Sequence, residues 1–319
     1  MTETSAGKIK KEEHIFKSTS GVCDIHTVIW YPDKEKYENP LGVVQIAHGM
    51  IDHIERFEGL ALYLTERGFV VAGNDHLGHG DSVLTKEDYG YFTEKNASRC
   101  VVEDMHKLTA IMKKKYPDVP YFLLGHSMGS FLSRRYITEY GYELNGVLLL
   151  GTGNQPDIVV KSGILLAKLV RLIKGERYRS PFLNHLMFGS YNARVVNPVT
   201  DKDWVCGNAE VIKEYVADEK CSYLFTVNGY LGLLDTIAYV KKVSNIRKVP
   251  RDLPVILAAG TKDPVGGYGR DVKKLFVTYS RHFYDVELRL YEDCRHELHN
   301  ELIQEDVFED LYQWICKHR

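Results

Sequence analysis

The sequence lacks several features that would assign it to a specialised class of protein. Its six cysteines are scattered without a Cys-x-x-Cys pair, which argues against a zinc knuckle or a dithiol redox motif. It has no run of about 18 uncharged apolar residues, which excludes a conventional membrane-spanning helix. Neither sign of charge is in excess, because 41 Lys and Arg face 43 Asp and Glu. A broad basic surface for nucleic acid is therefore not expected.

The beginning of the sequence also lacks the apolar segment of a secretory signal peptide, since residues 1–14 alternate charged and small polar side chains. Together with the scattered cysteines, this predicts a cytoplasmic protein with reduced thiols. The composition is otherwise ordinary: of 319 residues, 44% are hydrophobic, which is enough apolar material for a sizeable core. The sequence leaves the oligomeric state open.

Short β-rich apolar runs alternate with segments of helical periodicity. The expected strands cover residues 22–30, 43–47, 69–74, 121–124, 146–150, 253–259 and 286–291, and the expected helices cover 54–67, 97–115, 127–139, 231–243, 269–280 and 300–317. Nearly continuous apolar strands indicate a parallel sheet that is buried on both faces. We therefore predict an α/β fold, a mostly parallel sheet with helices on both faces, with an antiparallel hairpin over residues 16–30 at its edge.

The alternation breaks off between residues 152 and 230, which contain no clear strand and mostly helical periodicity. Loops of this length are uncommon inside a compact domain and often carry function. We interpret residues 152–230 as a helical cap inserted into the fold. The core is then divided into a first part, residues 1–151, and a second part, residues 231–319.

The strongest local motif is Gly125-His126-Ser127-Met128-Gly129, which directly follows an apolar strand and opens a helix. This is the context of a nucleophile elbow, in which a strained turn exposes a serine Oγ at the carboxyl edge of the sheet. The helix N-terminus adds unpaired N–H groups beside that serine. We therefore predict that Ser127 is the catalytic nucleophile.

A nucleophilic serine needs a general base that is oriented by a third group. Asp263 and His296 each follow a predicted strand and come after Ser127 in the order Ser, Asp, His that this kind of site requires. His299 is the main rival of His296, but it is expected to lie near the start of the last helix. For Asp263, the alternative role is that of a turn aspartate before Pro264. We predict that Ser127, Asp263 and His296 form a catalytic triad.

The oxyanion of a tetrahedral intermediate needs two N–H donors. We expect the backbone amides of Met128, after the nucleophile, and Met50, which follows the strand at residues 43–47, to supply them. His48 is expected to be structural, and so is Asp75 in the loop at residues 74–82. That loop is rich in histidine and acid, but we propose no metal there.

These motifs together resemble the α/β-hydrolase superfamily, and within it the monoacylglycerol lipase and lysophospholipase branch of serine-aminopeptidase-like hydrolases. The resemblance rests on residues 47–50 with Arg56-Phe57, and on residues 75–82, 125–130, 260–266 and 295–297. Two motifs depart from the family pattern: Leu77 replaces an arginine, and Glu219-Lys220 replaces Asp-Pro before a cap cysteine. The resemblance implies a carboxylic ester hydrolase that forms an acyl-enzyme and needs no cofactor.

The cap contains an amphipathic segment at residues 158–174, and residues 158–180 carry six basic side chains against one acidic. Such a helix can shelter an acyl chain, lie on a lipid interface or simply pack on the core. We therefore expect a serine esterase or lipase that acts on single-chain lipids such as monoacylglycerols or lysophospholipids. A short-chain esterase or thioesterase is the alternative, followed by a peptidase and by a non-catalytic ligand-binding protein.

Overall fold

The computed structural model describes residues 9–319, which build a single eight-stranded sheet. The order across the sheet is β1-β2-β4-β3-β5-β6-β7-β8. The strands are β1 (Lys10–Lys17), β2 (Asp24–Tyr31), β3 (Gly42–Ala47), β4 (Phe69–Asn74), β5 (Tyr121–His126), β6 (Gly146–Leu150), β7 (Val255–Gly260) and β8 (Val286–Tyr291). β1 and β2 form an antiparallel hairpin at one edge, β2 pairs antiparallel with β4, and all further pairings are parallel.

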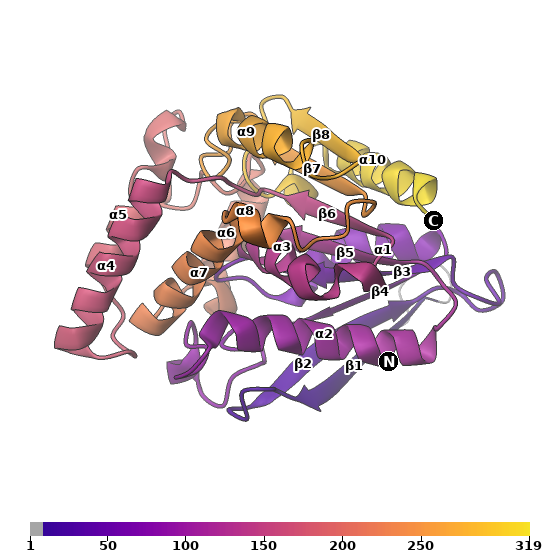
Figure 1. Cartoon of the computed structure of the whole chain (residues 1–319), viewed down its shortest axis with the longest axis horizontal. Helices are drawn as coiled ribbons and strands as arrows, with labels where there is room; N and C mark the ends of the chain where they lie inside the picture. The colour runs from indigo at the N-terminus through magenta and orange to yellow at the C-terminus, as the bar shows by residue number, and fades with distance from the viewer. Residues whose placement is uncertain (1–8) are drawn as a thin grey trace.

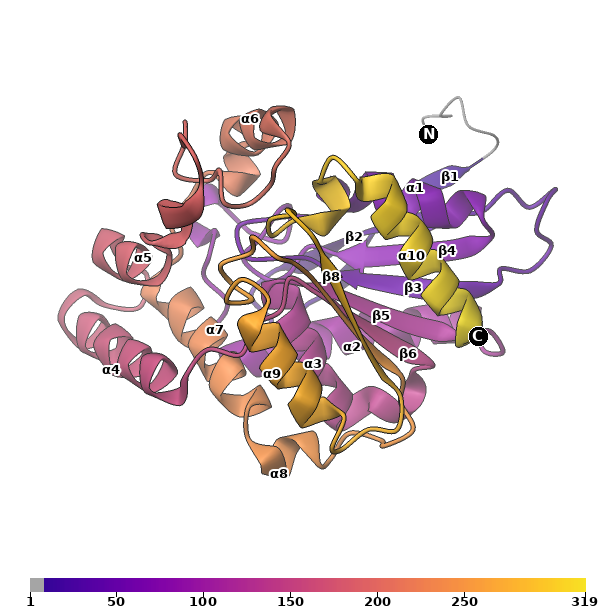
Figure 2. The ribbon, with the colours of Figure 1, turned by 90° about the horizontal axis from the view of Figure 1, so that it is seen from above.

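Helices cover both faces of this sheet, as Figure 2 shows. On one side lie α1 (Glu58–Glu66) and α10 (Gln304–Lys317), and on the other lie α2 (Ala97–Lys115), α3 (Met128–Tyr140) and α9 (Arg270–Tyr279). Each strand from β3 to β7 is buried along its whole length, as expected for strands covered on both faces. Because successive side chains alternate in direction, Val43 joins the core under α2 and α3 whereas Val44 joins the core under α1 and α10.

The segment between β6 and β7 contains no strand and projects beyond the sheet (Figure 1). Its helices are α4 (Asp157–Lys174), α5 (Pro181–Phe188), α6 (Ala209–Ala217), α7 (Val227–Val240) and α8 (Val243–Ile246). Figure 1 shows α4 and α5 at the far left of the molecule, next to α7. We call residues 152–230 the cap. The division of the chain into this cap and a core in two parts stays a prediction.

The predicted elements agree with the observed ones to within a few residues, and the differences have local causes. The helix expected at 231–243 begins at Val227, because the Thr226 Oγ1 accepts a hydrogen bond from the Gly229 N–H at 3.1 Å and caps the helix. The helix expected at 300–317 begins at Gln304, after a separate 3₁₀ turn at Leu298–Asn300. The hairpin extends further than expected, since β1 already begins at Lys10.

The amphipathic segment of the cap forms α4 as expected, but its apolar side chains do not share one environment. Val160 and Ala167 are buried, whereas Leu165, Leu169, Leu172 and Ile173 are exposed. The apolar residues are spread too widely around the helix for one buried face to hold them. Across residues 9–319, the structure has no helix of the length and apolarity that crossing a membrane requires.

Candidate active site

Ser127 lies at the sharp turn between β5 and α3, as the motif predicts. Its backbone has φ 52° and ψ −119°, outside the regions that non-glycine residues normally adopt. The Ser127 N–H donates to the Leu150 carbonyl on the neighbouring strand at 3.0 Å, and the Ser130 Oγ donates to the Ser127 carbonyl at 2.6 Å. These bonds hold the strained turn in place, an arrangement typical of functional sites.

Gly129 explains why this turn needs a glycine after the serine. A Cβ at position 129 would lie 2.0 Å from the Ala47 carbonyl oxygen and 2.5 Å from that of His48. The first turn of α3 therefore packs directly on the backbone at the end of β3. This contact brings the loop at residues 48–53 next to the serine, and a Cβ on Gly49 would lie 3.4 Å from the Ser127 Cβ.

His296 and Asp263 follow β8 and β7, and the fold brings them together. The Nδ1 of His296 lies 3.0 Å from the Asp263 Oδ2, and both side chains are almost fully buried. The other oxygen of Asp263, Oδ1, accepts the Val265 N–H at 2.8 Å, which fixes the carboxylate. Burial of the His296 ring opposes its protonation, but the nearby Asp263 carboxylate outweighs this effect and raises the pKa of His296 above its ordinary value.

Ser127 and His296 line one cavity of about 420 Å³, which lies between the core and the cap. This volume is typical of sites that bind small molecules. Much of the lining is apolar and includes Ile51, Phe131, Val159, Leu166, Leu186, Met187, Leu233, Leu234 and Ile237. A largely apolar cavity beside a strained serine is suited to a substrate with a hydrocarbon portion.

Both predicted oxyanion donors line the same cavity as Ser127. Met128 is the first residue of α3, and Met50 lies in the loop that Gly129 contacts. Within residues 9–319, neither backbone N–H donates a hydrogen bond. The two amides are thus available to an oxygen atom of a bound substrate.

A buried ionic network connects this loop to the segment that carries His296. The Asp52 Oδ2 accepts the Gly49 N–H at 3.1 Å, and the Asp52 Oδ1 accepts a hydrogen bond from the Arg56 Nη1 at 3.0 Å. Arg56 also donates two hydrogen bonds to the Glu297 carboxylate, at 2.7 and 2.6 Å. Burial disfavours the charged carboxylate of Asp52, but the Arg56 guanidinium outweighs it and holds the pKa of Asp52 well below its usual range.

The cap also holds the segment after β8 through backbone hydrogen bonds. The N–H groups of His296 and Glu297 both donate to the Val205 carbonyl, at 3.1 and 2.8 Å. Trp204 places its indole ring 5.2 Å from the His296 imidazole, measured between ring centroids. The position of His296 therefore depends on the cap as well as on the sheet.

His299 and His48 occupy sites that differ from that of His296. The His299 ring stacks on Phe57 with a centroid distance of 4.1 Å, and it does not line the cavity. Burial lowers the pKa of His299 to about 4. The Nε2 of His48 accepts the His76 N–H at 2.9 Å, as expected for a structural histidine.

Some residues of the site escape sequence reasoning. Arg56 and Glu297 stand in the motifs of the family resemblance, but only the fold shows that they pair. Trp204 and Val205 lie in the cap, and no spacing in the sequence indicates that they contact His296. Only the tertiary structure reveals these contacts, because Trp204 and Val205 are far from His296 in the sequence.

The chain is similar to known proteins over most of its length. Residues 38–303 match the family model described as serine aminopeptidase, S33. The chain is 27% identical to the monoacylglycerol lipase of Mycolicibacterium smegmatis over 97% of this chain and 98% of that protein. It is also 27% identical to the monoglyceride lipase of Mus musculus over 88% of this chain and 84% of that protein.

Among solved structures, a thermostable carboxyl esterase from Bacillus coagulans in complex with glycerol superposes with a TM-score of 0.88. The two chains are 28% identical, and the match covers 97% of this chain and 98% of the esterase. The similarity confirms the predicted α/β-hydrolase fold.

Proposed function

The chain belongs to the serine aminopeptidase S33 family, and on this premise we propose that it hydrolyses monoacylglycerols through a triad of Ser127, His296 and Asp263. It is a hydrolase of the monoacylglycerol lipase-like branch of the α/β-hydrolases. The assignment of the triad rests on one arrangement of side chains. Ser127, which has a strained backbone, lines the same cavity as His296, and the Asp263 carboxylate lies 3.0 Å from the His296 imidazole.

The proposed reaction runs in two stages through an acyl-enzyme. The Ser127 Oγ attacks the ester carbonyl while His296 takes the hydroxyl proton, and the Met50 and Met128 amides stabilise the oxyanion. His296 then returns the proton to the leaving alcohol. A water molecule releases the fatty acid by the same sequence of steps, with Asp263 orienting the imidazole throughout.

The lining of the cavity is largely apolar, which supports a substrate with a single acyl chain that makes most of the contacts. Each buried methylene contributes about 0.8 kcal/mol of transfer free energy, so a longer chain gains binding energy as long as the cavity accommodates it. The names of the lipase relatives support glycerol as the alcohol. The similar carboxyl esterase supports carboxylic esters as the substrate class, and a short-chain esterase is the alternative function.

We further propose that the exposed apolar side chains of the cap contact a lipid interface. Leu165, Leu169, Leu172 and Ile173 are exposed on α4, as are Phe182 and Leu186 on α5. Lysines and arginines stand among the α4 residues, a composition typical of helices that lie at anionic lipid surfaces. The predicted cytoplasmic location is a separate proposal, which the six unpaired cysteines support.

The experiment that tests the substrate is a panel of esters with kcat/KM as the readout. 1-Monoacylglycerols from acetyl to palmitoyl are compared with lysophosphatidylcholines, thioesters and aminoacyl amides. We expect kcat/KM to rise with acyl length among the monoacylglycerols and to exceed that of a lysophosphatidylcholine with the same chain. A profile that peaks at acetyl would establish the short-chain esterase instead, and preference for the amides would establish a peptidase.

A further inference from the structure

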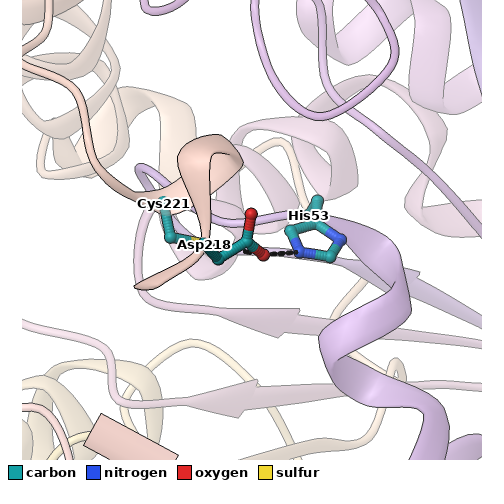
Figure 3. Close-up of side chains that lie close together, drawn as sticks. All are labelled: His53, Asp218 and Cys221. Atoms are coloured by element: carbon teal, nitrogen blue, oxygen red, sulfur yellow. Dashed lines mark hydrogen bonds and ion pairs between the residues drawn. The ribbon is translucent and has the colours of Figure 1, made fainter. Parts of the chain in front are cut away.

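Three potential metal ligands meet where the cap contacts the core, outside the proposed triad (Figure 3). His53 lies at the end of the loop that carries Met50, whereas Asp218 and Cys221 belong to the cap. The His53 Nε2 is 2.8 Å from the Asp218 Oδ2, and the Cys221 Sγ is 3.8 Å from the same oxygen. All three ligand atoms lie within 4.8 Å of one another.

The local backbone explains why the two cap residues face the same point. Asp218 caps the 3₁₀ helix Glu219–Cys221, and in a 3₁₀ helix the side chains at positions i and i+3 lie on the same side. The Asp218 Oδ1 accepts the Lys220 N–H at 2.8 Å. This bond fixes the carboxylate and leaves the Oδ2 directed toward His53.

Within residues 9–319, no lysine or arginine forms an ion pair with the carboxylate of this cluster. Lys220 directs its Nζ to Asp81 at 2.6 Å, and Arg56 is bound to Asp52 and Glu297. The ion pair that Asp218 forms in this part of the chain is with the imidazole of His53. A divalent cation would therefore bind there without displacing a lysine or an arginine.

We propose that His53, Asp218 and Cys221 bind a zinc ion that joins the cap to the loop at residues 48–53. Imidazole nitrogen, carboxylate oxygen and thiolate sulfur are the usual ligands of zinc, and water completes a site with three protein ligands. Tetrahedral coordination at zinc separates such ligand atoms by roughly 3.3–3.7 Å, so the His53 Nε2 and the Asp218 Oδ2 would have to move apart by about half an ångström. The Cys221 thiol proton is released to solvent as the sulfur–zinc bond forms.

Solvent reaches the cluster through Asp218, whose side chain is 32% exposed, whereas that of His53 is 9% exposed. A metal ion can therefore enter from the aspartate side, and a coordinated water can remain there. Cys221 is buried. The ion would therefore lie between this thiol and solvent, at the boundary between cap and core. It would thus hold the cap against the loop that precedes α1.

Two other groups of potential ligands are less suitable. Among His26, Asp75 and Asp81, the Asp75 carboxylate already accepts hydrogen bonds from the backbone N–H groups of Ile54 and Asp81. The group at Asp285, Glu287 and His318 contains no thiol, and Lys317 pairs with its glutamate. A thiolate signature in a spectrum would therefore identify the His53 cluster.

The test uses cobalt(II) as a spectroscopic substitute for zinc in the full-length protein, after removal of metal with a chelator. We expect one cobalt ion per chain, a sulfur-to-cobalt charge-transfer band in the near ultraviolet, and loss of that band when zinc is added. Zinc should also raise the Tm of the wild type. Cys221→Ser should lose the band, and Asp218→Asn should weaken zinc binding more than about 10-fold.

Cys100→Ser is the matched control, because Cys100 lies on α2 outside the cluster, and this variant should retain the band and the shift in Tm. Circular dichroism establishes that each variant is folded. If Cys221→Ser does not fold, Asp218→Asn and His53→Gln decide the question. The proposal is overturned if the wild type gives no charge-transfer band, or if folded cluster variants bind zinc as tightly as the wild type.

Discussion

The Arg56 guanidinium binds the Glu297 carboxylate through two parallel hydrogen bonds, with N–O distances of 2.7 and 2.6 Å. Because Glu297 directly follows His296, and Arg56 also binds Asp52, this pair joins the proposed base to the loop of the proposed oxyanion site. Two-point contacts between arginine and carboxylate fix geometry as well as charge. The pair therefore positions two parts of the site that are distant in sequence.

We expect Glu297→Gln to lower the free energy of unfolding by about 3 kcal/mol, because it leaves the Arg56 guanidinium with one carboxylate fewer in a buried setting. Urea unfolding measures this change. Glu210→Gln is the control, since Glu210 forms a highly exposed ion pair with Lys213, and the expected loss is below about 0.5 kcal/mol. Equal losses in the two variants would contradict the expectation that the buried pair with Arg56 stabilises the fold more than an exposed ion pair does.

The two neighbouring histidines are expected to differ in their effect on catalysis. His296→Ala should lower kcat by about four orders of magnitude or more, because the general base is removed. His299→Phe keeps a ring stacked on Phe57 and should change kcat by less than about tenfold, since His299 does not line the cavity. Steady-state kinetics on a soluble ester decide between them, and a larger loss at position 299 would reverse the assignment.

The raised pKa of His296 predicts the acid limb of the pH profile. A general base must be unprotonated, so activity is lost as the pH falls through its pKa, and the acid limb of kcat/KM should lie above the ordinary imidazole value of about 6.5. Asp263→Asn removes the charge that raises this pKa. The limb of that variant should move to lower pH while its kcat falls; an unmoved limb would argue against the pairing.

Two leucines on α4 lie in different surroundings, and we expect them to have different roles. Leu166 lines the cavity, so Leu166→Asp should lower kcat/KM for a long-chain monoacylglycerol much more than for an acetyl ester. Leu169 is 47% exposed and does not line the cavity. Leu169→Asp should therefore spare the acetyl ester and weaken binding to anionic vesicles by about tenfold, as expected when one apolar contact is lost.

Vesicle co-sedimentation and the acyl-length series measure these two effects separately. Equal behaviour of the two variants in both assays would contradict the division of α4 into a cavity-lining and a surface side. The sequence alone did not allow this division, because the apolar residues of α4 follow a helical period on more than one side. Only the packing against α7 determines which of them face inward.

The parts of the site that the sequence predicts are those with local causes. Ser127 and Gly129 stand in one short turn whose strain and close packing require their residue types. Asp263 and His296 follow strands, and parallel strands bring their carboxyl ends to one edge of the sheet. For these residues, the order of elements along the chain was sufficient to predict their proximity.

The parts that could not be predicted depend on contacts between segments that are distant in sequence. The hydrogen bonds from the His296 segment to Val205, and the meeting of His53 with Asp218, arise from how the cap docks on the core. No local motif predicts either contact, because the partners are far apart in the chain: His53 and Asp218 are separated by 165 residues. The sequence predicts that the helix over residues 158–174 can shelter an acyl chain, but it does not indicate which of its side chains line the cavity.

The most direct test of the central claim is covalent labelling of the protein with a fluorophosphonate, followed by mass spectrometry of the modified peptide. We expect one adduct per chain on Ser127, with loss of monoacylglycerol hydrolysis in proportion to labelling. A folded Ser127→Ala variant should take up no label and lose about six orders of magnitude in kcat. An adduct on another residue, or near-wild-type turnover by Ser127→Ala, would contradict the proposed triad.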